Sequence, residues 1–86
     1  MQGHDTISRP PIIVIRDNGS IILWQAAISL SDSHLTKTSR LNVRRGSAQG
    51  TGASAKALAN AYEAICELCK LNDVPPPPLN SCIVET

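Results

Sequence analysis

Two apolar runs flank a turn signal in the segment Pro11-Ile12-Ile13-Val14-Ile15-Arg16-Asp17-Asn18-Gly19-Ser20-Ile21-Ile22-Leu23-Trp24. Asn18-Gly19 favours a two-residue hairpin turn, because a turn of the primed type accepts positive φ at both central positions. A turn centred there fixes the register. The expected pairs are Ile15 with Ile22 and Ile13 with Trp24 on one face, and Val14 with Leu23 and Arg16 with Ile21 on the other. Both faces of the hairpin are therefore apolar.

The second strand of this hairpin is expected to be long, and a third strand is expected after it. The second run continues to Leu30 with clear period-two alternation of apolar and polar residues. Residues 31–34 indicate a turn, and residues 35–45 indicate a third, more polar strand. In that strand we expect Leu41 and Val43 to point into the core.

A helix is expected at about residues 53–71, after the glycine-rich loop formed by residues 46–52. Thr51 or Ser54 could cap its start, and Asn72 could adopt a left-handed conformation at its end. Apolar residues recur at spacings of three and four, which predicts one buried face and one exposed face. The expected buried residues are Leu58, Ala61, Tyr62, Ile65, Leu68 and Cys69, and the expected exposed residues are Lys56, Asn60, Glu63, Glu67 and Lys70.

The prolines at 75–78 cannot continue the helix and predict a stiff spacer that returns the chain to the sheet. Residues 82–84 would form a short last strand. The expected fold is α+β, with the order β-β-β-α-β: a small antiparallel sheet of three to four strands and one amphipathic helix packed on one face. Residues 1–10 would form a flexible N-terminal tail, and residues 11–86 a single domain.

The composition of the 86 residues favours a small protein of the cytoplasm. The first residues lack the basic and apolar regions of a signal peptide, and no apolar run approaches the length of a membrane span. Three cysteines are an odd count, which favours reduced thiols over a disulfide framework. The net charge of +1 gives no overall attraction to nucleic acid or to anionic lipid.

One segment is nevertheless strongly basic, since no acidic residue occurs between Ser33 and Tyr62. Two interpretations remain open. The cations could protect the edge of the sheet from pairing with other chains. Alternatively, together with the amides of the glycine loop at the helix N-terminus, they could contact nucleic acid or an acidic protein. The cations concerned are Lys37, Arg40, Arg44, Arg45 and Lys56.

The sequence does not predict an enzyme, a metal site, a cofactor or a small-molecule substrate. The glycine loop has no lysine where a phosphate-binding P-loop requires one. Cys66 and Cys69 form a Cys-x-x-Cys pair inside the predicted helix, where structural burial is favoured over metal binding with Cys82 or redox chemistry. Asp17 is needed beside the turn, and Glu63 falls on the exposed face of the helix.

The helix sequence Ala55-Lys56-Ala57-Leu58-Ala59-Asn60-Ala61-Tyr62-Glu63-Ala64-Ile65, after a three-stranded meander, resembles the truncated ribonuclease-H-like fold of HicB-type antitoxins. The resemblance implies a non-catalytic domain, because Lys56 or Ala57 stands near the position where an enzymatic ribonuclease H has an acidic residue. The chain lacks the DNA-binding appendage of many such antitoxins. It is also similar, in size and in having one sheet-and-helix domain, to small phage-encoded inhibitors such as anti-CRISPR proteins.

The second apolar face of the hairpin carries the functional prediction. The helix covers one face only, so the other is left for a neighbour. We expect a small non-catalytic binding or inhibitor module of the kind that mobile elements encode, which pairs with itself as a homodimer or blocks a partner protein. The alternative is a nucleic-acid-binding protein that uses residues 37–56. The expected protein interface comprises Ile12, Val14, Arg16, Ile21 and Leu23.

Overall fold

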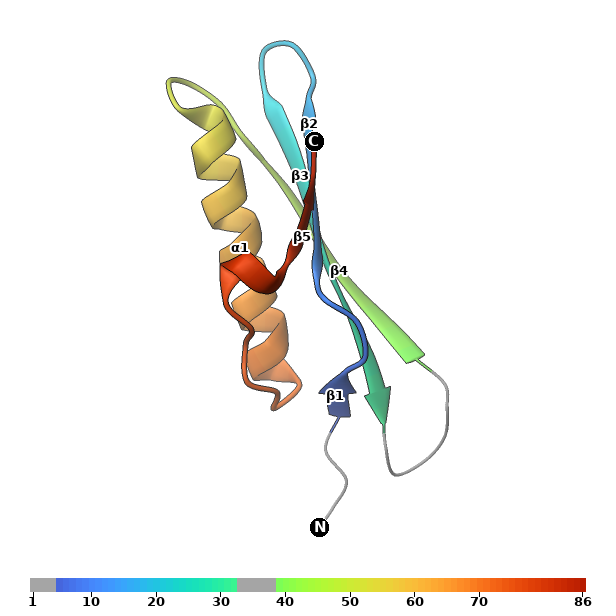
Figure 1. Cartoon of the computed structure of the whole chain (residues 1–86). Coiled ribbons are helices and arrows are strands. Elements are labelled where there is room, and N and C mark those ends of the chain that lie inside the picture. The colour runs from blue at the N-terminus through green and yellow to red at the C-terminus, as the bar shows by residue number, and fades with distance from the viewer. Residues whose placement is uncertain (1–4, 33–38) are drawn as a thin grey trace.

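The computed structural model describes residues 5–32 and 39–86, which form one sheet with a helix packed on one of its faces (Figure 1). This arrangement confirms the predicted α+β fold. Two features were not expected: a short strand lies within the first ten residues, and the last strand runs parallel to its neighbour. The elements are β1 (Asp5–Ile7), β2 (Ile12–Asp17), β3 (Ile22–Asp32), β4 (Ser39–Ala48), α1 (Ala53–Leu71), the 3-10 helix η1 (Leu79–Ser81) and β5 (Ile83–Glu85).

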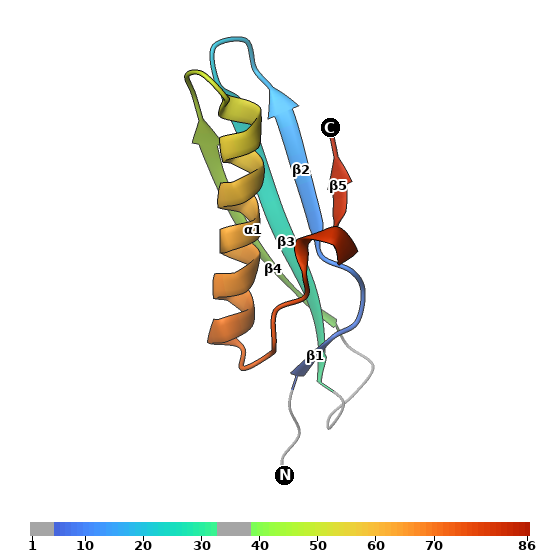
Figure 2. The same cartoon turned by 60° about the vertical axis from the view of Figure 1, so that its left-hand side comes forward.

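β3 is the central strand of the sheet. Its first half pairs with β2 and its last residues pair with β1, while β4 pairs along nearly its whole length on the other side. β5 adds to the outer side of β2 in parallel, so the order across the sheet is β4-β3-β2-β5. β4 and β5 therefore run in the same direction, and α1 is the crossover between them (Figure 2).

The register of the first hairpin differs from the predicted one by two residues. Ile15 pairs with Trp24 and Ile13 with Ala26. Gly19 has φ +86°, whereas Asn18 and Ser20 do not have positive φ, so the turn is centred on Gly19-Ser20 with the φ pattern of type II′. The Asp17 carboxylate accepts a hydrogen bond from the Gly19 amide at 2.9 Å. Because the shift is two residues, the faces assigned to the strand residues are retained.

The prediction that Leu41 and Val43 point into the core was wrong. Val43 pairs with Ala27, so it lies on the face opposite the helix, and Leu41 on that same face is 67% exposed. Gly46 faces the helix side and pairs with Trp24, whose indole ring occupies the space that a Cβ at position 46 would need. The strand also extends to Ala48, so the glycine-rich loop is shorter than predicted.

The helix has the predicted bounds, but both of its ends differ from expectation. Neither Thr51 nor Ser54 caps its start: Gly52 is the N-cap, with φ 73° and no side-chain hydrogen bond. At its end Asn72 is not left-handed, and Asp73 has the positive φ instead. The Val74 amide donates to the Cys69 carbonyl at 2.9 Å, which completes a Schellman motif in which Asp73 occupies the position usual for glycine.

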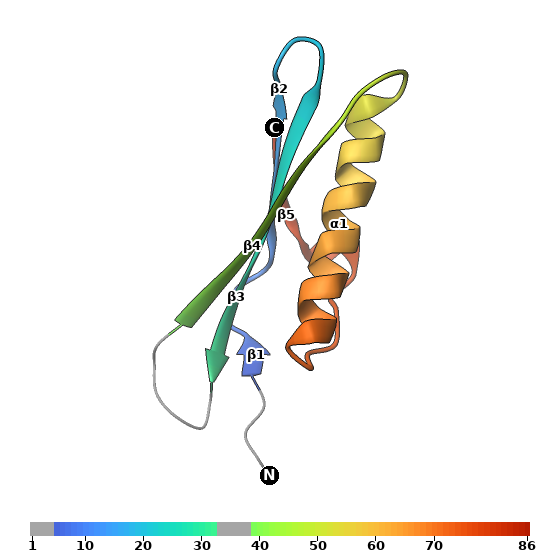
Figure 3. The ribbon, with the colours of Figure 1, turned by 180° about the vertical axis from the view of Figure 1, so that it is seen from behind.

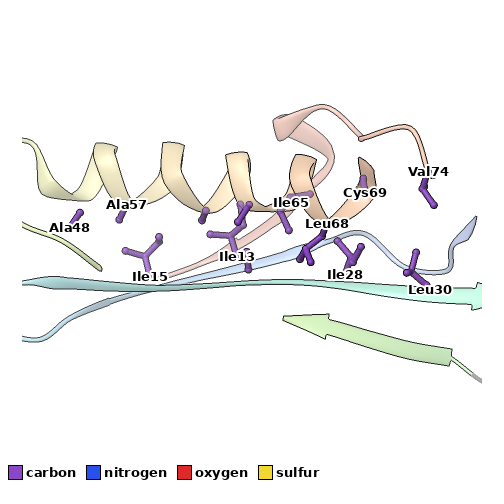
Figure 4. Packing of buried hydrophobic residues seen from close by; sticks show 13 residues of the cluster. Ile13, Ile15, Ile28, Leu30, Ala48, Ala57, Ile65, Leu68, Cys69 and Val74 are labelled. Carbon is purple, nitrogen blue, oxygen red and sulfur yellow. The ribbon is translucent and has the colours of Figure 1, made fainter. Parts of the chain in front are cut away.

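The core lies between α1 and the helix-facing side of the sheet (Figure 4). β2 and β3 contribute branched aliphatic side chains, and three alanines of the helix allow its backbone to approach the sheet closely. The predicted exposed residues of the helix are exposed. Leu58 and Tyr62 are only half-buried, and Ala57 and Ala64 join the buried face. The buried cluster comprises Ile13, Ile15, Ala26, Ile28, Leu30, Ala48, Ala57, Ala61, Ala64, Ile65, Leu68, Cys69 and Val74.

The proline run connects the helix to the last strand without regular structure. The Tyr62 hydroxyl donates to the Pro77 carbonyl at 2.7 Å and so fixes the run against the helix. After η1, the Ile83 amide donates to the Pro11 carbonyl at 2.8 Å, which begins the pairing of β5 with β2. The last strand is thus one residue later than predicted.

Candidate interaction surface

No described element covers the face of the sheet opposite α1 (Figures 1 and 3). We call this surface the open face. Its membership follows from alternation, because Ile13 and Ile15 point to the helix and their strand neighbours point away. Its residues are Ile12, Val14 and Arg16 of β2, Leu23, Gln25, Ala27 and Ser29 of β3, Leu41, Val43, Arg45 and Ser47 of β4, and Ile83 and Glu85 of β5.

The middle of the open face is apolar. Ile12 is 37% exposed, Leu23 39% and Ile83 45%, although all three lie within paired strands. A continuous row across β5, β2, β3 and β4 is formed by Ile83, Ile12, Ala27 and Val43. Contiguous apolar surface of this kind is uncommon on a monomer, which makes the open face the candidate interaction surface.

Glu85 and Arg45 lie on opposite edges of the open face, and Arg16 lies between those edges on β2. The next row reads Glu85, Val14, Gln25 and Arg45 from β5 to β4, so it has an acidic end and a basic end. Arg45 Nε donates to Gln25 Oε1 at 3.0 Å, which holds the guanidinium over the sheet. This bond uses the inner nitrogen and leaves the two terminal nitrogens without a hydrogen bond among the described residues, so they could bind a carboxylate.

Four of the five predicted interface residues, Ile12, Val14, Arg16 and Leu23, lie on the open face. Ile21 lies in the turn, where its carbonyl accepts a hydrogen bond from the Asn18 amide at 2.9 Å. The sequence reasoning missed the contribution of β4 and β5. Gly46 was the available signal, because a glycine inside a strand marks a close approach, here of Trp24, and it fixes which face Val43 and Arg45 occupy.

The predicted basic residues do not form one surface. Arg40 and Arg44 lie on the helix side of β4, and Arg45 lies on the open face. Arg44 forms an ion pair with Glu67 of α1, at 3.4 Å between Nη1 and Oε1. Lys56 is exposed in the first turns of α1, at the other end of β4 from Arg40. Lys37 lies outside the described residues.

The cysteines lie near the C-terminal half of α1 and are free thiols. Burial raises the pKa of Cys69, and burial also raises the pKa of Cys82. The side chain of Cys66, followed by desolvation, raises the pKa of Tyr62. Raised values keep these groups protonated, which is the opposite of what a reactive thiol requires. Among the described residues, no group of three or more His, Cys, Asp or Glu side chains could hold a metal ion.

Within the described residues, no helix is both long enough and apolar enough to cross a membrane. Comparisons of the chain with protein-family models, with curated proteins and with solved structures gave no match.

Proposed function

We propose that this chain is a small non-catalytic binding module that associates with protein through its open face. The observation that carries the proposal is the exposure of Ile12, Leu23 and Ile83 on one face of three hydrogen-bonded strands. Full burial of one such side chain contributes about 1.5–3 kcal/mol. Since these three and Leu41 are already partly covered, a partner would gain about 4 kcal/mol from them together. A small domain has only a marginal stability, so the burial of this surface by a partner would matter more to it than to a large one.

An inhibitor role is part of the same proposal. The order of a three-stranded meander, a helix and a last strand is the pattern that underlies the proposed relation to HicB-type antitoxins and to small phage-encoded inhibitors. A module that leaves one face of its sheet uncovered and apolar at its centre is suited to blocking the surface of another protein.

Site-specific photo-cross-linking tests the binding role. A benzophenone amino acid would replace Val14 in the middle of the open face or, as the matched control, Asn60 on the exposed side of α1. In cells of the natural host we expect a discrete protein adduct from position 14 and none from position 60. Absence of an adduct at position 14, or the same adducts from both positions, would overturn the proposal.

Nucleic-acid binding through residues 37–56 is the weaker candidate. Arg44 and Arg45 lie on opposite faces, and Arg44 already has Glu67 as its partner. Binding of this kind would show an affinity that falls steeply with salt and with Arg44→Ala plus Arg45→Ala. We expect no shift of DNA or RNA at low salt.

A further inference from the structure

We propose that the partner is a second copy of this chain, packed open face to open face about a twofold axis that runs parallel to the strands. This inference rests on the proposed function and specifies the occupant of the same surface. It is carried by the placement of opposite charges: Arg45 on the β4 edge and Glu85 on the β5 edge lie in one row of the sheet.

The registers define that row step by step. Glu85 pairs with Val14, Val14 with Gln25, and Gln25 with Arg45. A twofold axis parallel to the strands and midway between β2 and β3 places β5 of one copy over β4 of the other without changing the level along the strands. Arg45 of each copy then meets Glu85 of the other, so a single symmetric interface forms two ion pairs.

The neighbouring apolar row is also self-complementary under this operation. Ile12 of one copy lies over Ala27 of the other, and Ile83 lies over Val43. The first contact sets a large side chain against a small one, which suits two sheets packed about 10 Å apart. Because only Nε of Arg45 bonds to Gln25, its terminal nitrogens, which form no hydrogen bond with the described residues, are available to the incoming carboxylate.

Two other ways of pairing copies lack this complementarity. A twofold axis across the strands keeps β4 over β4 and β5 over β5, so Arg45 never reaches Glu85. Antiparallel pairing of the β4 edges would bring together two strands that each carry Arg40, Arg44 and Arg45 and no acidic residue. Like charges directly opposed across a sheet destabilise the pair.

The size of the face predicts a weak dimer. β4 has 10 residues and β3 has 11, which at about 3.3 Å per residue and about 4.8 Å per strand gives a face about 33 Å long and about 19 Å wide. Its area is therefore at most about 600 Å², near the lower limit for each partner of a specific complex. A dissociation constant in the micromolar range is expected.

Sedimentation equilibrium between about 1 and 300 µM tests the inference, a range that brackets that constant. The unmodified chain should change from monomer to dimer with concentration. Arg45→Glu or Glu85→Arg alone should weaken dimerisation about tenfold or more, because each replaces two attractions with two repulsions. The double variant should recover most of the affinity. Lys70→Glu on the exposed side of α1 is the control and should leave it unchanged.

The outcomes separate this inference from the proposed function. A monomer at every concentration overturns the dimer, and the binding role then stands or falls on whether position 14 cross-links to a different protein. A dimer in which the double variant fails to recover affinity, while circular dichroism shows it folded, overturns the face-to-face arrangement. Recovery by the double variant supports it, because no other arrangement considered brings these two side chains together.

Discussion

At the scale of the residue, the contact between Trp24 and Gly46 fixes how β4 sits on β3. The indole ring lies where the side chain of residue 46 would be, and its Nε1 is buried among the described residues without an acceptor. The ring therefore contributes apolar packing at the cost of one unsatisfied donor. It also explains why Ser47 and Arg45, rather than Gly46, point to the open face.

Replacing Gly46 by alanine should lower the free energy of unfolding markedly, although it adds only one methyl group. Gly46→Ala places a methyl group against the indole of Trp24, closer than van der Waals contact allows, and overpacking of this kind costs about 1–3 kcal/mol of unfolding free energy. Urea unfolding followed by tryptophan fluorescence measures it. Ser47→Ala, one residue on and exposed, is the control, with a change within about 0.5 kcal/mol. Equal stability of the two variants would show that Trp24 does not pack there.

Cys69 should make stability depend on pH in the alkaline range. Burial, with smaller contributions from Cys66 and Cys82, raises its pKa above the usual 9.0. As the pH rises past about 9, the unfolded chain loses this proton first, so the free energy of unfolding falls. Cys69→Ala should reduce the loss between pH 7.5 and 10 in urea unfolding, with the remainder due to Cys82 and Tyr62. An undiminished loss in the variant would contradict this assignment.

At the scale of the element, the first hairpin shows that moving the turn by one residue along the chain shifts the register of the two strands by two residues. The Asn18-Gly19 dipeptide predicts a type I′ turn, but Asp17 accepts the Gly19 amide and the turn forms one residue later. The strands remained predictable because alternation is insensitive to an even shift. The length of α1 was predictable for a similar reason, since its apolar spacing persists over 19 residues.

The turn can be tested with two alanine substitutions. Gly19→Ala should cost about 1–2 kcal/mol, because Gly19 has φ +86° and an L-residue is strained there. Asn18→Ala should change stability by less than about 0.5 kcal/mol, because Asn18 does not have positive φ. Thermal unfolding of both variants gives the comparison. A similar loss from each would indicate a turn centred on Asn18-Gly19 instead.

At the scale of the whole molecule, the sequence predicts a two-layer fold more readily than it predicts the open face. The half of that face contributed by Ile12, Val14 and Leu23 follows from alternation within one hairpin. The half contributed by Val43, Arg45, Ile83 and Glu85 depends on which strands become neighbours. That choice depends on packing between distant segments, and local pattern carries no information about it. The face of β4 is the exception, because Gly46 within the strand carried a local signal for it that the prediction did not use.

The parallel pairing of Ile12 with Ile83 joins residues 71 positions apart in the chain. Closing so large a loop costs conformational entropy before the contacts between the two strands can offset that cost. We therefore infer that the β2–β5 pair forms last. The hairpin of β2 and β3 needs only local closure and can form first. Until β5 arrives, the outer edge of β2 presents unpaired amides and carbonyls to any extended chain nearby. Until residues 83–85 pair with β2, a chain that is still folding can therefore pair wrongly with another chain along this edge.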